Sequence, residues 1–320
     1  MSFNPIYKLR DWIPKEKINF EKIKLNLNYI YFIKNNLSLC KVDWYWLSNN
    51  ENAIYLLEKN LDKVNWSNLS SNENAIHLLE KNLDKVCWIS LSSNKNAIHL
   101  IEKNLDKVDW DNLSGNENAI HLLEKNLDKI NWNNLSVNKN AIHLLEKNID
   151  KIDWYSLTTN ENAIQILEKN LDKLIWISLS SNENAISILE KNLDKVYWNW
   201  LSGNKNAIHL LERNLNKVNW ILLSENPNAI DILEQNLDKV DWYWLSGNKN
   251  ALKILEKNIN NVDWDIFSEN PSIFTFNYKE MMKKCKPFAE ELTAYVFHPK
   301  RLIRFSKKYN IDFDILLEIY

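Results

Sequence analysis

The chain has 320 residues, of which 45% are hydrophobic and 26% charged, so it is long enough to bury a large core and is not of the disordered class. Its net charge of −2 excludes a chain-wide attraction to nucleic acid or to anionic membranes. The three cysteines, Cys40, Cys87 and Cys285, form no CxxC pair, which indicates a reducing compartment.

The first residues, MSFNPIYKLRDWIPKEK, contain no apolar stretch of signal-peptide length, and no apolar run is long enough to span a bilayer. We therefore expect a protein that is not secreted, works inside a cell and has no membrane partner. Residues 1–43 are predicted to form an N-terminal cap that contains a degenerate repeat. In that repeat Phe20 stands where later repeats have Trp, and Asn26 and Asn28 match their pair of asparagines.

Residues 44–263 consist of ten units of 22 residues, marked by a tryptophan at every 22nd position from Trp44 to Trp264. No insertion interrupts this series. Such regularity requires a structure in which each unit has almost the same surroundings, and a stack of repeats provides that.

Each unit is predicted to begin with a short helix, at residues 44–48 in the first one. Asp or Asn at the position of Asp43 would cap its first turn, and Trp44 and Leu47 would share a face. The three glycines all fall two residues after that Leu position, where we expect them to end the helix in the left-handed region. They are Gly115, Gly203 and Gly247.

A second helix is predicted at residues 51–59, with Asn50 as its cap. Pro227 and Pro271 directly follow the equivalent asparagine, which is typical of a helix start. An apolar stripe follows, and Asn60 would end this helix in the left-handed region. Leu61 and Val64 are expected to pack under the turn.

The predicted fold class is therefore all-α: an α-solenoid of short helix pairs with 22 residues per repeat and with terminal caps. A leucine-rich repeat is the alternative, because its unit length is similar. Its Leu-to-Asn spacing differs by one residue from the spacing here, and the segment AIxLLEK is typical of a helix. We prefer helix pairs.

Residues 264–320 are predicted to contain a partial repeat and a C-terminal helical cap. Pro299 is placed as the first residue of a helix that is rich in basic residues and has no acid. This helix could contact phosphate or an acidic partner, or it could be a lid with Leu302, Ile303 and Phe305 packed inward. Its basic residues are Lys300, Arg301, Arg304, Lys307 and Lys308.

The phrase NPNAIxLLExNLDKVxWxxLS, present here around residues 226–230, resembles repeat proteins of uncharacterised function in giant and other large DNA viruses. The segment ELTAYVFHPKRLIRF is similar to a C-terminal segment that accompanies such repeats. The resemblance covers nearly the whole chain. It implies a viral origin and a place in the host cytoplasm or the virion, and it implies no activity.

Three columns of side chains have structural interpretations. The tryptophans could stack on bases, but they recur in step with the core pattern and are expected to lie wedged between units. The position of His77 also holds Tyr55 and Lys253, which indicates an exposed surface rather than a metal site. Asparagines at the positions of Asn50, Asn52 and Asn60 are expected to form hydrogen bonds from unit to unit.

No nucleophile constellation, phosphate loop or metal cluster stands out, so we predict no enzyme, cofactor, metal or small-molecule substrate. The two residues after each Trp vary freely, and variation in a rigid frame is how repeat proteins diversify a recognition surface. Unconstrained drift of a surface position explains the variation equally well. The candidate contacts with a protein partner are Tyr45, Trp46, Tyr155, Trp200, Tyr243 and Trp244.

The predicted function is a non-enzymatic scaffold for protein–protein interaction. Two alternatives are nucleic-acid binding through the basic C-terminal helix, and a structural component of the virion.

Overall fold

The computed structural model describes residues 7–19, 22, 42–283, 286, 295, 298 and 300–304. The chain divides into two compact units. One comprises Asp11–Ile273 and contains the repeats. The other combines Met1–Arg10 with Phe274–Tyr320.

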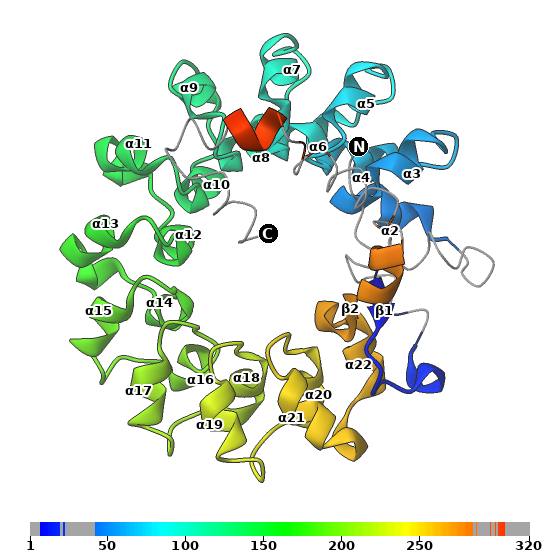
Figure 1. The fold of residues 1–320 in the computed structure, drawn as a ribbon. Helices are drawn as coiled ribbons and strands as arrows, with labels where there is room; N and C mark the ends of the chain where they lie inside the picture. The colour runs from blue at the N-terminus through cyan, green and yellow to red at the C-terminus, as the bar shows by residue number, and fades with distance from the viewer. Residues whose placement is uncertain are drawn as a thin grey trace. The chain divides into compact units, whose positions relative to one another are not determined.

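The repeats are helix pairs that follow one another along a curved path within the larger unit (Figure 1). The helices that begin with the repeated Trp lie on the inner side of the curve, and we call them the inner row. They are α2 (Trp44–Ser48), α4 (Trp66–Ser71), α6 (Trp88–Ser93), α8 (Trp110–Gly115), α10 (Trp132–Val137), α12 (Trp154–Thr159), α14 (Trp176–Ser181), α16 (Trp198–Leu201), α18 (Trp220–Glu225), α20 (Trp242–Gly247) and α22 (Trp264–Glu269).

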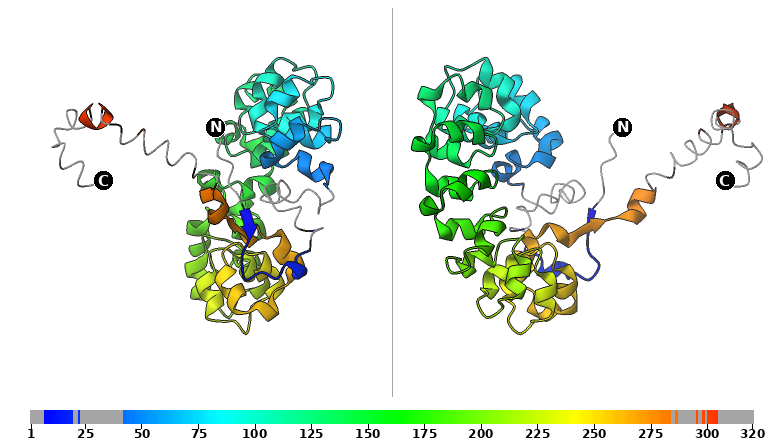
Figure 2. Two further views of the ribbon diagram at one scale, coloured as in Figure 1. Left: turned by 45° about the vertical axis from the view of Figure 1, so that its right-hand side comes forward. Right: turned by 90° about the vertical axis from the view of Figure 1, so that its left-hand side faces the viewer.

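The second helix of each pair lies on the outer side of the curve, and we call these helices the outer row (Figure 1). They are α3 (Ile54–Glu58), α5 (Ile76–Glu80), α7 (Ile98–Glu102), α9 (Ile120–Leu123), α11 (Ile142–Lys147), α13 (Ile164–Lys169), α15 (Ile186–Glu190), α17 (Ile208–Glu212), α19 (Ile230–Glu234) and α21 (Leu252–Lys257). Two side views show the repeats in chain order, from blue through green to yellow (Figure 2). The predicted all-α solenoid of 22-residue helix pairs is confirmed.

Single 3₁₀ turns join several of the helices, and one of them lies outside the repeats. They are η1 (Lys15–Lys17), η3 (Glu51–Ala53), η4 (Lys95–Ala97), η5 (Leu127–Lys129), η6 (Ile149–Lys151), η7 (Leu171–Lys173), η8 (Ile259–Asn261) and η9 (Pro271–Ile273). The second helix of a repeat is therefore shorter than predicted: in the first repeat η3 precedes a regular helix that covers only Ile54–Glu58.

The core is a column of small and aliphatic side chains that are contributed once per repeat. In the fourth repeat Leu113, Ala119 and Leu123 are fully buried, and their equivalents repeat along the stack. The Trp side chains are only half-buried, so the prediction that they lie wedged in the core is too strong. From Trp44 to Trp220, a lysine Nζ from the end of the same repeat lies over each indole, 4.6–5.3 Å from the ring centroid.

Buried polar side chains connect each repeat to the preceding one. The Asn94 amide nitrogen donates to the carbonyl oxygens of Ser70 and Asn72, 2.9 and 3.2 Å away. Its oxygen accepts from the Asn96 backbone, 3.0 Å away, which is the predicted cap. The Asn96 amide donates to the carbonyl of Glu73. The predicted unit-to-unit bonds therefore exist at the Asn50 and Asn52 positions.

Several local predictions are wrong. Asn at the Asn60 position does not bridge repeats, because its amide donates to a carbonyl four residues earlier, that of Leu56 in the first repeat. Its backbone is not left-handed either: Asn148 has φ −133°. None of the three glycines has a positive φ. Val at the Val64 position is buried as predicted, whereas the Leu61 position is largely exposed, as at Leu127.

The smaller unit contains a two-stranded antiparallel sheet that the all-α prediction omitted. Strand β1 (Tyr7–Leu9) pairs with β2 (Phe274–Phe276), with Tyr7 opposite Phe276 (Figure 2). Residues 278–283 and 300–304 of this unit are helical. No described helix is long and apolar enough to cross a membrane.

Candidate functional site

The variable positions after each Trp lie in the first turn of the inner-row helices. A capping side chain fixes this turn: Asp43 Oδ1 accepts the backbone N–H groups of Tyr45 and Trp46, 3.2 and 3.4 Å away. The same cap recurs in most repeats, for example between Asp241 and the Trp244 backbone at 3.1 Å. The core residue three positions after Trp faces inward, and the first variable side chain is exposed in every repeat. The second is exposed where it is a Trp and is half-buried or buried in the other repeats.

All six aromatic residues that the sequence nominated for partner contact are exposed. Their exposed fractions range from 39% to 63%, which is unusual for such large side chains outside binding surfaces. The residues are Tyr45, Trp46, Tyr155, Trp200, Tyr243 and Trp244. Two pairs are brought into edge-to-face ring contact: Tyr45 with Trp46 at 5.5 Å and Tyr243 with Trp244 at 5.4 Å between ring centroids.

Large exposed apolar residues gather in the first helix of the inner row, at Tyr45 and Trp46, and in the later repeats. We call six of them the apolar inner surface: Tyr155, Ile177, Trp200, Ile221, Tyr243 and Trp244. The earlier repeats from α4 to α10 carry mainly Ser, Asn and Asp at the same positions, with Ile89 as the exposed exception. The large apolar side chains are therefore distributed unevenly along the stack.

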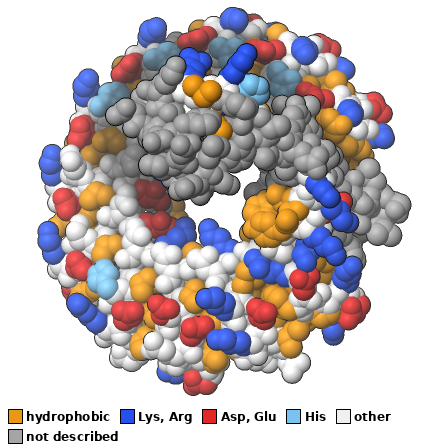
Figure 3. Space-filling model, viewed as in Figure 1, with side chains coloured by type: hydrophobic (Ala, Val, Ile, Leu, Met, Phe, Trp, Pro, Cys, Tyr) orange, Lys and Arg blue, Asp and Glu red, His pale blue; other side chains and the backbone are white. Residues whose placement is uncertain are grey.

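The inner row is almost free of charge. Its eleven helices contain four acids, Asp111, Glu225, Asp265 and Glu269, and no Lys, Arg or His. Charged side chains instead recur around the periphery, over the outer row and its turns (Figure 3). Backbone phosphates need unbalanced basic residues, so the inner row does not have the composition of a nucleic-acid surface.

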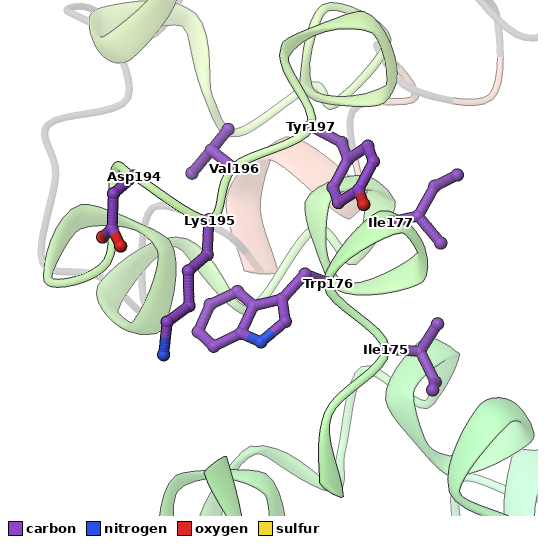
Figure 4. Close-up of a pocket in the computed structure, with 7 residues that line it drawn as sticks. All are labelled: Ile175, Trp176, Ile177, Asp194, Lys195, Val196 and Tyr197. Atoms are coloured by element: carbon purple, nitrogen blue, oxygen red, sulfur yellow. The ribbon is translucent and has the colours of Figure 1, made fainter. Parts of the chain in front are cut away.

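One hollow interrupts the inner row, where two successive repeats lack the usual cap residue. It has a volume of about 400 Å³ and is lined by residues 175–177 and 194–197. Ile175 and Tyr197 occupy the cap positions there, and neither side chain caps its helix. Lys195 extends beside the Trp176 ring, and Tyr197 lies near Ile177 (Figure 4). Tyr197, which lines the hollow and is half exposed, is therefore a further exposed aromatic side chain close to Ile177.

The histidine column forms contacts that the sequence did not reveal. Each of five histidines places Nε2 within 2.6–2.7 Å of a Glu Oε1 in the preceding repeat. These pairs are exposed, so they contribute little to stability. Within the described part of the chain, no group of three or more potential ligands could hold a metal ion. The histidines are His77, His99, His121, His143 and His209.

Cys87 occupies a cap position, where the Ser90 hydroxyl donates to its sulfur at 3.5 Å. This hydrogen bond lowers the pKa of the Cys87 thiol below its usual range, although burial opposes the effect. Cys40 and Cys285 lie outside the described residues. The hydroxyl of Ser67 acts on the thiol in the same direction as that of Ser90.

The C-terminal basic segment is partly described. Lys300, Arg301 and Arg304 lie exposed on the helical residues 300–304. Of the two apolar residues described there, Leu302 is half-buried and Ile303 is 44% exposed. Lys307 and Lys308, as well as Phe305, lie outside the described residues.

Sequence reasoning missed two exposed features. The first is Tyr197, which a departure from Asp or Asn at the cap position could have revealed. The second is a column of Leu or Ile at the Leu61 position, for example Leu171 and Leu193, which are 40% and 42% exposed. The aliphatic character of that position suggested burial, and the sequence carries no signal against it.

The fold and the repeated site define a helical repeat protein that presents a variable surface on a regular frame. No family model, no curated protein and no solved structure matches the chain, so the comparisons do not assign this repeat protein to a family.

Proposed function

We propose that the protein is a non-enzymatic scaffold that binds a protein partner through the apolar inner surface. The observation that carries the proposal is the row of exposed Tyr, Trp and Ile side chains on inner-row helices that have almost no charge. Trp and Tyr are the residues most enriched among side chains that dominate binding energy at protein interfaces. The partner would contribute an apolar segment with few acidic residues.

Replacement of Trp200 and Trp244 by Ser tests this surface. Ser already occupies the equivalent position in other repeats, as at Ser156 and Ser178, so the double variant should fold. Full-length protein is immobilised, and captured proteins from cells in which the chain is expressed are quantified by mass spectrometry. The binding partner should be depleted at least about 10-fold with the variant, as expected when interface anchors are lost.

The matched control replaces Leu171 and Leu193 by Ser. These side chains are as exposed as Trp244 but belong to the turn column rather than to the inner row. Capture should be unchanged with the control. Equal capture by the wild type and the inner-row variant, or equal loss with both variants, would count against the apolar inner surface.

A second candidate function is nucleic-acid binding by the basic helix at residues 300–304. The exposure of Lys300, Arg301 and Arg304 on one short helical segment favours it. Replacing all three by Gln should weaken retardation of DNA or RNA in a gel, and should reduce the slope of log affinity against log salt by about 2–3.

The control for this experiment replaces Lys81, Lys103 and Lys125, which are exposed on the outer side of three repeats. It removes the same charge from elsewhere in the chain and should leave the slope unchanged. If the wild type shows no salt-sensitive retardation, the second candidate is excluded.

The virion is the third setting in which such a scaffold would act. Its test is mass spectrometry of purified particles of the source virus, in which the chain should be present in amounts comparable with structural proteins. Absence from the particles would exclude a structural role in the virion.

A further inference from the structure

The N-terminal segment docks on the last repeat of the stack. Along most of the stack, the backbone N–H at the cap position donates to the buried Ser Oγ of the preceding repeat, as Asp263 does to Ser246 at 3.0 Å. Ser268 has no following repeat in the sequence, yet its Oγ accepts the backbone N–H of Asn19, 2.9 Å away. This bond joins residues that are 249 positions apart.

Further contacts show that Asn19 occupies the cap position of a following repeat. Its amide donates to Asp265 Oδ1 at 2.7 Å, as Asn131 does to Asp111 at 3.0 Å in the middle of the stack. Its oxygen accepts the backbone N–H of Lys22 at 3.3 Å, which is the helix-capping bond of the other repeats. The last repeat is therefore contacted as if the stack continued into the N-terminal segment.

Apolar contacts accompany these hydrogen bonds. Ile18, directly before the cap residue, is 5% exposed, and Val262 at the equivalent position of the preceding repeat is buried as well. Trp12 packs against Trp264 and Phe267, with ring centroids 6.5 and 5.5 Å apart. Ile13 is also buried. An ion pair between Lys22 and Glu269, at 2.9 Å, lies at the edge of the contact.

None of these contacts depends on the covalent connection between the two ends of the chain. Residues 11–19 together with Lys22, which we call the docking segment, recognise the last repeat by side chains and by one backbone N–H. The same segment on another copy presents the same groups. An interface of this kind, with two different surfaces on one chain, is heterologous and can link copies head to tail.

We propose that the end face of the last repeat is a self-recognition site whose partner is the docking segment of a second copy of this chain. In the monomer the chain's own docking segment occupies the site. Tethering gives that segment an effective concentration in the millimolar range, so it outcompetes a second copy at ordinary protein concentrations. The in-cis contact therefore keeps the protein monomeric, and its release allows head-to-tail assembly.

Two full-length variants with complementary defects test the proposal. The first, K8P/W12A/N19P, lacks a working docking segment: proline at position 19 removes the N–H that Ser268 accepts, and proline at position 8 interrupts β1. The second, D265K/E269K/T275P, lacks a working site because its lysines repel Lys22 and cannot accept from Asn19, while the proline introduced in place of Thr275 interrupts β2. Circular dichroism first establishes that both retain the helical content of the wild type.

Each variant alone, like the wild type, should have the mass of one chain, 38.1 kDa, in light scattering after size exclusion. An equimolar mixture should contain a species of about twice that mass, because the intact segment of one variant meets the intact site of the other. A mixture that stays at the mass of one chain up to about 100 µM, roughly a tenth of the millimolar effective concentration, would overturn the proposal.

A labelled peptide of residues 7–22 provides a second measurement that does not depend on assembly. Fluorescence anisotropy should show binding to K8P/W12A/N19P at least about 100-fold tighter than to the wild type, whose site is filled in cis. The peptide with Asn19 and Trp12 replaced by Ala is the control and should not bind. Equal affinity of the peptide for the wild type and the first variant would show that the last repeat has no such site.

Discussion

The Asn138 side chain shows how one buried polar residue joins two repeats. Its amide donates to the carbonyl oxygens of Ser114 and Asn116, 3.0 and 3.1 Å away, and its oxygen accepts from Asn140. Only 1% of the residue is exposed, so water cannot replace these bonds. The site therefore needs a side chain that both donates and accepts, which explains why asparagine recurs there in every repeat.

Replacing Asn138 by Ala should therefore destabilise the protein by about 2–4 kcal/mol, because it leaves buried backbone groups without a partner. Asp in its place keeps the acceptor for Asn140 but loses both donors, and it sets a carboxylate against two carbonyl oxygens. We expect at least the same loss. The shift of the urea midpoint, followed by circular dichroism, measures both effects.

Asn133 provides the matched control, because it lies five residues earlier, in the helix that ends directly before Asn138, but is exposed. Its replacement by Ala should change the stability by less than about 0.5 kcal/mol. Similar midpoints for the two Ala variants would refute a structural role for the buried amide.

At the scale of the helix, the cap residue sets where each inner-row helix begins. Asp153 Oδ1 accepts the backbone N–H of Ser156 at 2.8 Å, and α12 starts at the residue directly after Asp153. Its own N–H donates to Ser136 of the preceding repeat, 3.1 Å away. The residue thus combines a helix cap, made by its side chain, with a contact between repeats, made by its backbone.

Asp153 replaced by Ala should cost about 1 kcal/mol, the usual loss when a cap side chain is removed, since the backbone bond to Ser136 persists. Asp153 replaced by Asn should be nearly neutral, because Asn65, Asn131 and Asn219 serve as caps elsewhere in the chain. Thermal or urea unfolding distinguishes the two. An Asn variant as unstable as the Ala variant would mean that the carboxylate charge matters, rather than the hydrogen bond.

Much of this element-level structure could be predicted from the sequence. The period of 22, the helix starts at Trp and the caps at Asp43 and Asn50 follow from local preferences that act ten times over. The ends of the helices could not be predicted as well. Asn60 and the glycines suggested left-handed stops, but side-chain and 3₁₀ hydrogen bonds satisfy the last carbonyls instead.

The candidate surfaces could also be predicted only in part from the sequence. The six aromatic residues named from sequence at the two variable positions are exposed, but the smaller side chains at the second position are mostly half-buried. The contact of the docking segment with the last repeat was not foreseen. Ile18 and Asn19 match the start of a repeat, but every repeat has two faces of similar chemistry, so the pattern does not indicate which end of the stack they cover.

Across the stack of repeats, the contacts are almost the same at each interface. The hydrogen bond from a cap-position N–H to a buried Ser hydroxyl joins residues 17 positions apart at both ends of the stack. It connects Asn65 with Ser48 near the start and Asp263 with Ser246 near the end. The two Asn amides reach back 22 to 24 residues in the same way. Each repeat therefore depends on its neighbours and not on its absolute place in the chain, and stability is close to a sum of repeat and interface terms.

Deletion of one whole period tests this property. Removing residues 109–130 joins Val108 to Asn131, so that Ser92 meets the N–H of Asn131 at the usual spacing of 17 residues. The variant should keep the same helical signal per residue and should unfold cooperatively at a slightly lower urea concentration.

Removing residues 109–129 deletes one residue fewer and leaves Ile130 as an insertion between Val108 and Asn131. This control should lose much more stability, because the Ser92 hydroxyl and the carbonyl oxygens of Ser92 and Asn94 no longer face the donors of the following repeat. Circular dichroism of the remaining repeats gives the comparison, and equal midpoints for the two deletions would show that register between repeats does not hold the stack together.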